Sequence, residues 1–286
     1  MKGKLIVGCS GWNYPDPAEK GGWVGPFYPD SKARFLRFYS KYFRTVEMDS
    51  TFYERFYSKM TLGTFIGIGK AAGDNFQISL KVPETITHLK RMHPDSLPAF
   101  EAFLEKIGPL KRMGKLGVIL FQLPPSFTVT EFRHVESFLD RLPREYEYAV
   151  EFRHPSWHTE GPWELLNQHN VAAVMTDSPE SSLQYLSNVT ITADHGFIRL
   201  HGRNRGYWYN YLYSDEELTP WVQKARDVMA ETMILRIYFN NHYGAKAVIN
   251  ALRFREMLGE SLNPDEKTML QRLKNYFSGT SLIGPS

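Results

Sequence analysis

The chain contains eight short apolar runs, and each of them ends in polar or charged residues. Most of the segments between the runs have the amphipathic pattern of a helix. Strands that are apolar along their length and polar at the carboxyl end are typical of a (β/α)8 barrel, whose interior is packed and whose chemistry lies at the rim where the strands end. The runs are Leu5–Ser10, Thr45–Ser50, Phe76–Val82, Val118–Gln122, Tyr148–His154, Val171–Asp177, Phe197–His201 and Leu235–Asn241.

The chain length supports one barrel. With 286 residues the chain is close to the roughly 250 residues typical of this fold, so we predict a single domain over residues 1–286. We expect long decorated loops at Trp12–Asp30 and Gly202–Ser214. Asp30 or Ser31 is predicted to cap the first helix, and Ser214 precedes the acidic first turn of another. The predicted helices are Ser31–Phe43, Ser58–Ala72, Leu97–Met113, Thr130–Leu142, Pro162–Gln168, Asp215–Glu231, Ala245–Leu258 and Asp265–Tyr276.

Composition narrows the class of protein. The 34 basic and 31 acidic residues give a net charge of +3, which is too balanced to favour a general coating of nucleic acid. The single cysteine, Cys9, excludes an intramolecular disulfide and fits a reducing compartment. We expect it to pack as a small apolar side chain. The first apolar run is too short for a signal peptide, and none approaches the ~18 residues that span a bilayer. We therefore expect a cytoplasmic protein with no membrane contact.

Strand periodicity assigns the polar residues to faces of the barrel. Side chains two residues apart point to the same side of a strand, so we expect one set of polar side chains to line the mouth. We expect His154 to turn toward the next loop. Burying so many charges costs free energy unless they pair or bind a ligand. A salt-bridge network that only stiffens the rim is the structural alternative. The predicted mouth residues are Glu47, Lys81, Glu151, Arg153, Asp177, Arg199, His201 and Asn240.

Short motifs recur at strand ends along the chain. They are Gly8–Trp12 with Tyr14, Phe27–Pro29, Val46–Tyr53, Phe76 with Lys81, Phe121–Pro125, Val150–His154 with Trp157, Arg199–Gly202 and Phe239–Asn241. Their order and spacing resemble the YecE-like family, also called the domain of unknown function seventy-two. The resemblance implies a TIM-type barrel and assigns no activity. It gives weight, without roles, to Glu47, Glu151, Arg153, His154, His201 and Asn241.

The residue types of the mouth suit proton transfer on an anionic substrate. Carboxylates and histidine are general acids and bases, and we prefer Glu151 and His201 as the reacting pair. Arginine and lysine hold phosphate or carboxylate, and asparagine and aromatic side chains orient a substrate. The candidate catalytic residues are Glu151, His201, Glu47 and Asp177. The candidate substrate-binding residues are Lys81, Arg153, Arg199, Asn240, Asn241, Tyr14, Tyr53, Trp157 and Trp208.

These residues predict an enzyme of the hydrolase or isomerase type. Its substrate is expected to be a polar, anionic small molecule, with phosphorylated and nucleotide-containing compounds included. No Gly-x-Ser-x-Gly nucleophile motif and no glycine-rich phosphate motif is present. The carboxylates and His201 are of the types that bind a divalent metal ion. However, arginines on the same rim would repel a cation, so a metal cofactor is not favoured and no cofactor is assigned.

The segment Gly202–Ser214 has the most unusual composition of the chain. Arg203 and Arg205 precede five aromatic residues, and such a mixture can stack on bases while it holds phosphates. This gives an alternative function, a nucleic-acid-binding and endonuclease-like module. The loop can equally be an aromatic lid over the barrel or a contact with another subunit. A protein without catalysis is the third reading, and the oligomeric state stays open.

Overall fold

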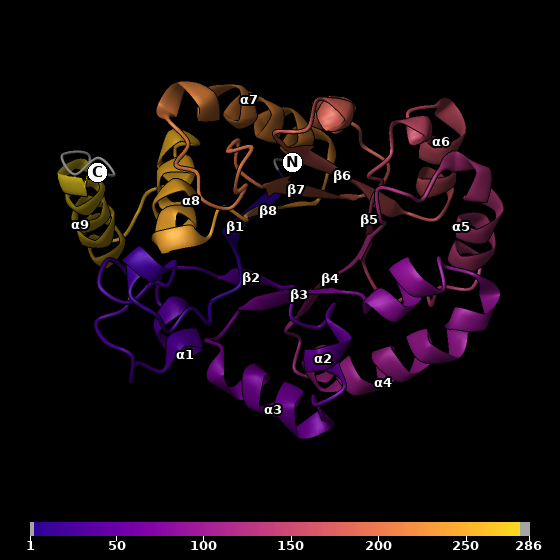
Figure 1. The fold of residues 1–286 in the computed structure, drawn as a ribbon, viewed down its shortest axis with the longest axis horizontal. Coiled ribbons are helices and arrows are strands. Elements are labelled where there is room, and N and C mark those ends of the chain that lie inside the picture. The colour runs from indigo at the N-terminus through magenta and orange to yellow at the C-terminus, as the bar shows by residue number, and fades with distance from the viewer. Residues whose placement is uncertain (1–2, 281–286) are drawn as a thin grey trace.

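Eight parallel strands close into one barrel in the computed structural model of the chain, which describes residues 3–280 (Figure 1). Each strand pairs with its neighbours in the sequence, and β8 pairs with β1. The strands are β1 (Lys4–Ser10), β2 (Thr45–Met48), β3 (Gln77–Lys81), β4 (Leu116–Gln122), β5 (Tyr148–Glu151), β6 (Val171–Asp177), β7 (His195–Leu200) and β8 (Ile234–Phe239). Every predicted run contributes one strand, so the prediction of a (β/α)8 TIM-type barrel is confirmed.

Helices surround the barrel in the order of the chain, and α9 lies outside α8 (Figure 1). They are α1 (Phe35–Tyr39), α2 (Glu54–Tyr57), α3 (Leu62–Ala71), α4 (Leu97–Arg112), α5 (Phe132–Leu139), α6 (Glu160–Gln168), α7 (Asp215–Glu231), α8 (Lys246–Met257) and α9 (Pro264–Thr280). Most lie where the sequence predicts them. The order of strands and helices therefore follows from the hydrophobic pattern.

Helix boundaries depart from the prediction at two places. The first helix begins at Phe35, so the prediction that Asp30 or Ser31 caps it is wrong. The predicted helix over Ser58–Ala72 begins only at Leu62, because Thr61 caps α3 with a capping box, and the short α2 ends before the predicted range, at Tyr57. Ser214 caps α7 as predicted: its side-chain oxygen accepts a hydrogen bond from the backbone of the third helical residue.

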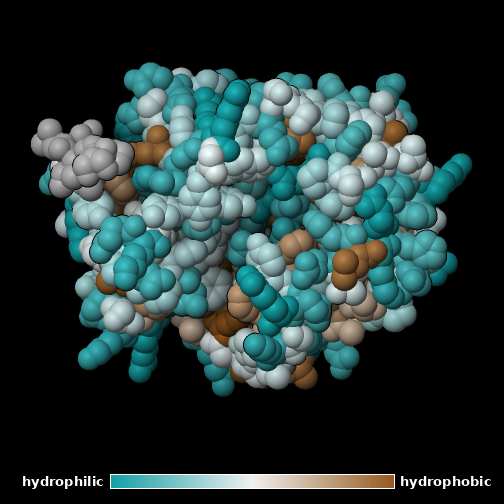
Figure 2. All heavy atoms as spheres, in the orientation of Figure 1, coloured by the Kyte–Doolittle hydropathy of each residue, from teal (hydrophilic) through white to brown (hydrophobic). Residues whose placement is uncertain are grey.

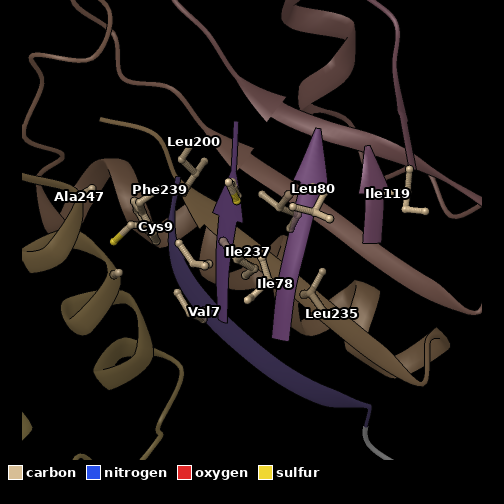
Figure 3. Packing of buried hydrophobic residues seen from close by; sticks show 14 of the residues in the cluster. Val7, Cys9, Ile78, Leu80, Ile119, Leu200, Leu235, Ile237, Phe239 and Ala247 are labelled. Atoms are coloured by element: carbon tan, nitrogen blue, oxygen red, sulfur yellow. The ribbon is translucent and has the colours of Figure 1, made fainter. Parts of the chain in front are cut away.

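Apolar side chains fill the space between the barrel and the helices, and they also fill the interior of the barrel. Between the barrel and α8, Cys9 and Phe239 lie close to Ala247 (Figure 3). Cys9 is fully buried, and burial raises the pKa of its thiol, so it packs as an apolar side chain. Inside the barrel, the Tyr238 hydroxyl is hydrogen-bonded to the hydroxyls of Thr45 (2.7 Å) and Ser79 (2.8 Å). This layer supports the polar residues at the carboxyl ends of the strands.

The outer surface is mainly polar. Figure 2 shows hydrophilic residues over most of one face, with hydrophobic residues in small scattered groups. Within residues 3–280, no helix is both long enough and apolar enough to cross a membrane.

Candidate active site

A buried ion cluster around Arg199 lies at the carboxyl ends of the strands. Arg199 extends from β7 and donates to both carboxylate oxygens of Glu47 on β2, from Nε at 2.8 Å and from Nη2 at 2.6 Å. Its Nη1 atom donates to Glu151 Oε2 on β5 at 2.5 Å and to Gln122 Oε1 on β4 at 2.9 Å. Each of these side chains is at most 7% exposed. One guanidinium thus links strands from different sides of the barrel.

The cluster leaves Arg199 and Glu47 little capacity for substrate. All three nitrogens of Arg199 donate to protein groups, so the structure does not support the prediction that it holds a substrate anion. Both oxygens of Glu47 accept from Arg199, which also leaves Glu47 poorly placed as an acid or base. Both residues instead fix the geometry of Glu151.

Glu151 has one oxygen bound by Arg199 and one oxygen that faces the mouth. Oε1 lies 3.4 Å from Arg153 Nε and 3.8 Å from His201 Nε2. Burial on its own would raise the pKa of Glu151, but the positive charge of Arg199, with His201 and Arg153, holds this pKa well below its usual range. Glu151 is therefore an ionised carboxylate at neutral pH.

His201 is held as a neutral imidazole by its neighbours. Asn240 Nδ2 lies 2.9 Å from Nδ1 of the ring and donates to it, so Nε2 carries the proton and faces Glu151. Burial and the charge of Arg199 lower the pKa of His201 from its ordinary value of 6.5. A neutral ring that presents an N–H group can donate to an oxygen of a substrate.

Arg153 and Lys81 are the positive charges that remain available in the mouth. Arg153 follows β5, is 14% exposed and lies 5.3 Å from the centre of the Trp208 ring. Among residues 3–280 its terminal Nη atoms have no hydrogen-bond partner within the protein. Lys81 ends β3, and its Nζ atom lies 3.6 Å from the centre of the Phe52 ring. Burial and Arg199 lower the pKa of Lys81 to about 8.

Aromatic side chains stand around the mouth. The Trp208 ring lies 6.3 Å from the His201 ring. Tyr14 donates its hydroxyl to Ser10 O at 2.8 Å and stacks on His242, while Tyr53 is 39% exposed at the rim. Tyr14 borders a cavity of about 420 Å³ next to β1 and β2. The mouth therefore has an aromatic wall beside its charged groups.

Trp157 does not belong to the mouth, and the prediction that it binds substrate there is wrong. A 3-10 turn, Pro155–Trp157, places it in the core, where it is fully buried. Its ring stacks on Phe152 at 4.3 Å and its Nε1 donates to Phe127 O. The preceding His154 turns toward this turn as predicted, because its ring lies 2.8 Å from Ser156 Oγ.

Asp177 and Asn241 point out of the barrel, so the predicted place of Asp177 in the mouth is wrong, and Asn241, a candidate substrate-binding residue, does not face the mouth. Asp177 accepts from Arg203 at 2.9 Å and from the Tyr213 hydroxyl at 2.7 Å. Asn241 donates to Asn250 Oδ1 and to a backbone oxygen of the loop after β7. Both residues fasten that loop to the barrel. Their outward direction follows from parity, since Met175 and Phe239 belong to the outer core.

Two polar residues of the mouth were missed in the sequence. Gln122 accepts from Arg199, and Ser10 has a buried hydroxyl oxygen without a hydrogen-bond partner in the described part of the chain. Parity supplies a signal for Gln122, because Leu120 two residues before it belongs to the inner core. Ser10 stands at the end of β1 beside Glu47 in the strand register.

The arrangement leaves little room for a metal site. Within residues 3–280, no three histidine, cysteine or acidic side chains come together as ligands. Arg199 lies between Glu47 and Glu151, where a cation that used both carboxylates would have to bind.

The fold and the mouth together define a class of protein: a (β/α)8 barrel with a buried ion cluster and a polar mouth at the carboxyl ends of its strands. The chain belongs to the family described as "Protein of unknown function DUF72", which it matches over residues 6–272. The resemblance to the YecE-like family is thereby confirmed.

Relatives and solved structures agree with this assignment. The chain is 25% identical to UPF0759 protein YunF of Bacillus subtilis over 287 residues, which cover 89% of this chain and 94% of YunF. It is 31% identical to UPF0759 protein YecE of Escherichia coli over 180 residues, 61% of this chain and 59% of YecE. A DUF72 family protein from Thermotoga maritima is 31% identical, with a TM-score of 0.75 and coverage of 90% of this chain and 100% of that chain. Another from Enterococcus faecalis is 21% identical with a TM-score of 0.70, covers 91% and 99%, and shows the fold alone.

Proposed function

We propose that this protein is an enzyme that binds a polar, anionic small molecule in the barrel mouth and transfers a proton on it with His201. One observation carries the proposal. Glu151 Oε1, Arg153 Nε and His201 Nε2 are buried, lie around one point, and have no hydrogen-bond partner among residues 3–280. Leaving such a group unsatisfied costs about 1–3 kcal/mol. Polar atoms of a substrate at this point would supply the missing partners.

Each group in the mouth has a distinct role in this proposal. The Arg153 guanidinium binds a phosphate or carboxylate of the substrate, and Lys81 adds a second positive charge. His201 donates its Nε2 proton to a substrate oxygen, and the ionised Glu151 accepts a hydrogen bond or a proton from the other side. Such a set suits hydrolysis or isomerisation. Asn240 acts as a positioning residue, because it holds the His201 ring.

Anion binding tests the proposal directly. We expect inorganic phosphate to bind the wild type and the Arg153→Met variant to bind it at least about tenfold more weakly, since a charged hydrogen bond is worth roughly 1.5–3 kcal/mol. Calorimetric titration measures both affinities. Arg205→Met is the matched control, because Arg205 is exposed on the loop after β7 and outside the mouth. Equal affinity of wild type and Arg153→Met would contradict the proposal.

We propose that the loop Gly202–Ser214 is a lid of this mouth rather than a nucleic-acid surface. Two of its aromatic side chains pack within the protein: Tyr209 stacks on His242 at 4.9 Å, and Trp208 lies over Arg153, while Tyr207 is exposed. Arg203 is paired with Asp177. Stacked and paired groups are poorly placed to bind bases and phosphates.

The lid proposal makes a prediction about nucleic acid. We expect no salt-dependent binding of a labelled single-stranded oligonucleotide, because binding that depends on phosphates weakens steeply as salt releases the counterions. Fluorescence anisotropy at 50 mM and 200 mM salt, on the order of the range where such binding collapses, measures it. Micromolar affinity that falls with salt and with Trp208→Ala would favour the nucleic-acid module instead.

A further inference from the structure

Lys81 is a buried amine without an acidic partner. Its side chain ends β3 at the barrel mouth and is 7% exposed. Among residues 3–280, no carboxylate lies within ion-pair distance of its Nζ atom, and no hydrogen bond fixes that atom. The Nζ atom lies over the face of the Phe52 ring, 3.6 Å from its centroid. The aromatic face attracts the ammonium form and holds the side chain in place, but it does not pair the amine with a carboxylate.

The backbone fixes where this amine points. The Thr51 hydroxyl donates to Lys81 O at 2.6 Å and ties the end of β3 to the segment after β2. On the same strand Ser79 faces the barrel interior through its hydrogen bond with Tyr238. Period-two alternation therefore directs the Lys81 side chain into the mouth.

The surroundings of Lys81 lower its pKa and so increase the share of the unprotonated amine. Burial and Arg199 lower its pKa to about 8, against the opposing effects of Glu151, Asp49 and Glu47. His88, whose ring lies 4.7 Å from the Phe52 ring, has a pKa near 4, lowered by burial and by Lys81, and is neutral at pH 7. At pH 7.5 roughly a quarter of such amines are unprotonated, against about one in a thousand for an ordinary lysine. A desolvated lysine beside another cation is a known form of activated nucleophile.

We propose that Lys81 captures the carbonyl carbon of an aldehyde or ketone substrate as an imine, while Arg153 holds an anionic group of the same molecule. This inference rests on the proposed function, because it uses the same mouth and the same anion-binding residue. It narrows the substrate class to anionic carbonyl compounds.

The covalent step balances without an oxidant or a reductant. The unprotonated Nζ atom forms a bond to the carbonyl carbon while the π electrons of the C=O bond move to oxygen. A proton passes from nitrogen to that oxygen and gives a carbinolamine. One more proton, from water, lets the hydroxyl leave as a water molecule while the nitrogen lone pair forms the C=N bond of an iminium ion, whose remaining N–H proton passes to the hydroxide left behind and gives the imine. His201 and Glu151 are the groups of the mouth that can relay these protons.

Reductive trapping tests the inference. Full-length protein is incubated at pH 7.5 with glyoxylate, a small anionic aldehyde, and sodium cyanoborohydride, whose hydride reduces the imine to a stable secondary amine. Peptide mass spectrometry then measures carboxymethyl groups on each lysine. We expect Lys81 to react at least about tenfold faster than Lys246, a half-buried lysine outside the mouth that donates to Asn210, because a larger share of Lys81 is unprotonated.

Two variants and one control aldehyde separate the possible causes of fast labelling at Lys81. Lys81→Arg keeps the positive charge and should still bind phosphate, but the fast site of labelling should disappear. Arg153→Met keeps the amine and should slow the labelling of Lys81 by glyoxylate about tenfold, while labelling by neutral acetaldehyde should stay unchanged. Circular dichroism of each variant shows whether the fold is retained.

The outcomes distinguish the two proposals. If phosphate binding depends on Arg153 but Lys81 reacts no faster than Lys246, the imine inference is overturned and the proposed function stands. If phosphate does not bind the mouth, the proposed function itself fails. If glyoxylate and acetaldehyde label Lys81 equally well in wild type and in Arg153→Met, the assignment to anionic carbonyl compounds is overturned.

Discussion

Replacing His201 with glutamine is expected to lower turnover by about 10²–10⁴-fold, because a positioned proton-transfer group contributes roughly that much to the rate. Glutamine retains an N–H donor of similar reach but cannot exchange a proton at neutral pH. Candidate substrates are found by ligand-induced stabilisation in a panel of phosphorylated and carboxylated metabolites that includes carbonyl compounds. Turnover of each compound that binds is then followed by NMR in wild type and variant. Binding should change only a few-fold, because Arg153 and Lys81 are untouched.

The pH profile separates a catalytic histidine from a structural one. Protonation of Nδ1 would place an N–H group against the Asn240 amide, which now donates to it, and the ring would lose its positioning contact. Because the pKa of His201 is lowered, protonation of its ring should reduce turnover only below the ordinary value of 6.5, apart from any change near pH 8, where Lys81 titrates. In Asn240→Asp a carboxylate favours the charged ring, so the fall in rate should move to higher pH. An unchanged profile and a wild-type rate in His201→Gln would contradict the assigned role.

The second large effect concerns stability. Arg199→Met should lower the free energy of unfolding by about 3–5 kcal/mol, because removing one partner of a buried ion cluster leaves uncompensated charges. Glu47 and Glu151 would then lie close together without the guanidinium that bridges them. Urea denaturation followed by circular dichroism measures the change. The triple variant Arg199→Met, Glu47→Gln, Glu151→Gln should recover much of the loss, and equal loss in both variants would contradict this explanation.

The same variant should reverse the pH dependence of stability. In the wild type the folded-state pKa of Glu151 lies below its unfolded value of about 4.5, so its contribution is present above that value and is lost as the pH falls through the folded pKa. Without Arg199, burial raises this pKa above the unfolded value. The folded state then binds more protons, and stability should rise as the pH is lowered toward 4.5.

Much of the fold could be predicted from the sequence for a simple reason. Parallel strands buried on both faces are apolar throughout, and their carboxyl ends alone carry polar residues, so both the barrel and the location of its mouth can be read from the chain. Period-two alternation also predicted correctly that Glu47, Lys81 and Glu151 point into the barrel mouth. Each of them has another residue of the inner face two positions earlier in the chain. Helix boundaries follow less directly from the sequence. The apolar pattern begins before Thr61, but the cap formed by Thr61 sets the start of α3.

The same periodicity failed where both faces of a strand are equally apolar. In β6 the residues Val171–Met175 are apolar on both faces, and a polar residue ends each face, Thr176 on one and Asp177 on the other. Parity alone therefore does not distinguish the inward direction from the outward one. Trp157 was misplaced for another reason: a short turn after β5 reverses the chain and returns the indole to the core. Neither outcome has a signal in the local sequence.

The sequence by itself determined the barrel, the rim at which polar residues gather and the family to which the chain belongs, because these depend on patterns along the chain. Only the tertiary structure decided which charged side chains pair with one another. Arg199 and Arg153 are both arginines at strand ends, yet one is enclosed by Glu47, Glu151 and Gln122 while the other keeps free donors. That difference, like the unpaired amine of Lys81, arises from distances across the barrel between residues far apart in the chain.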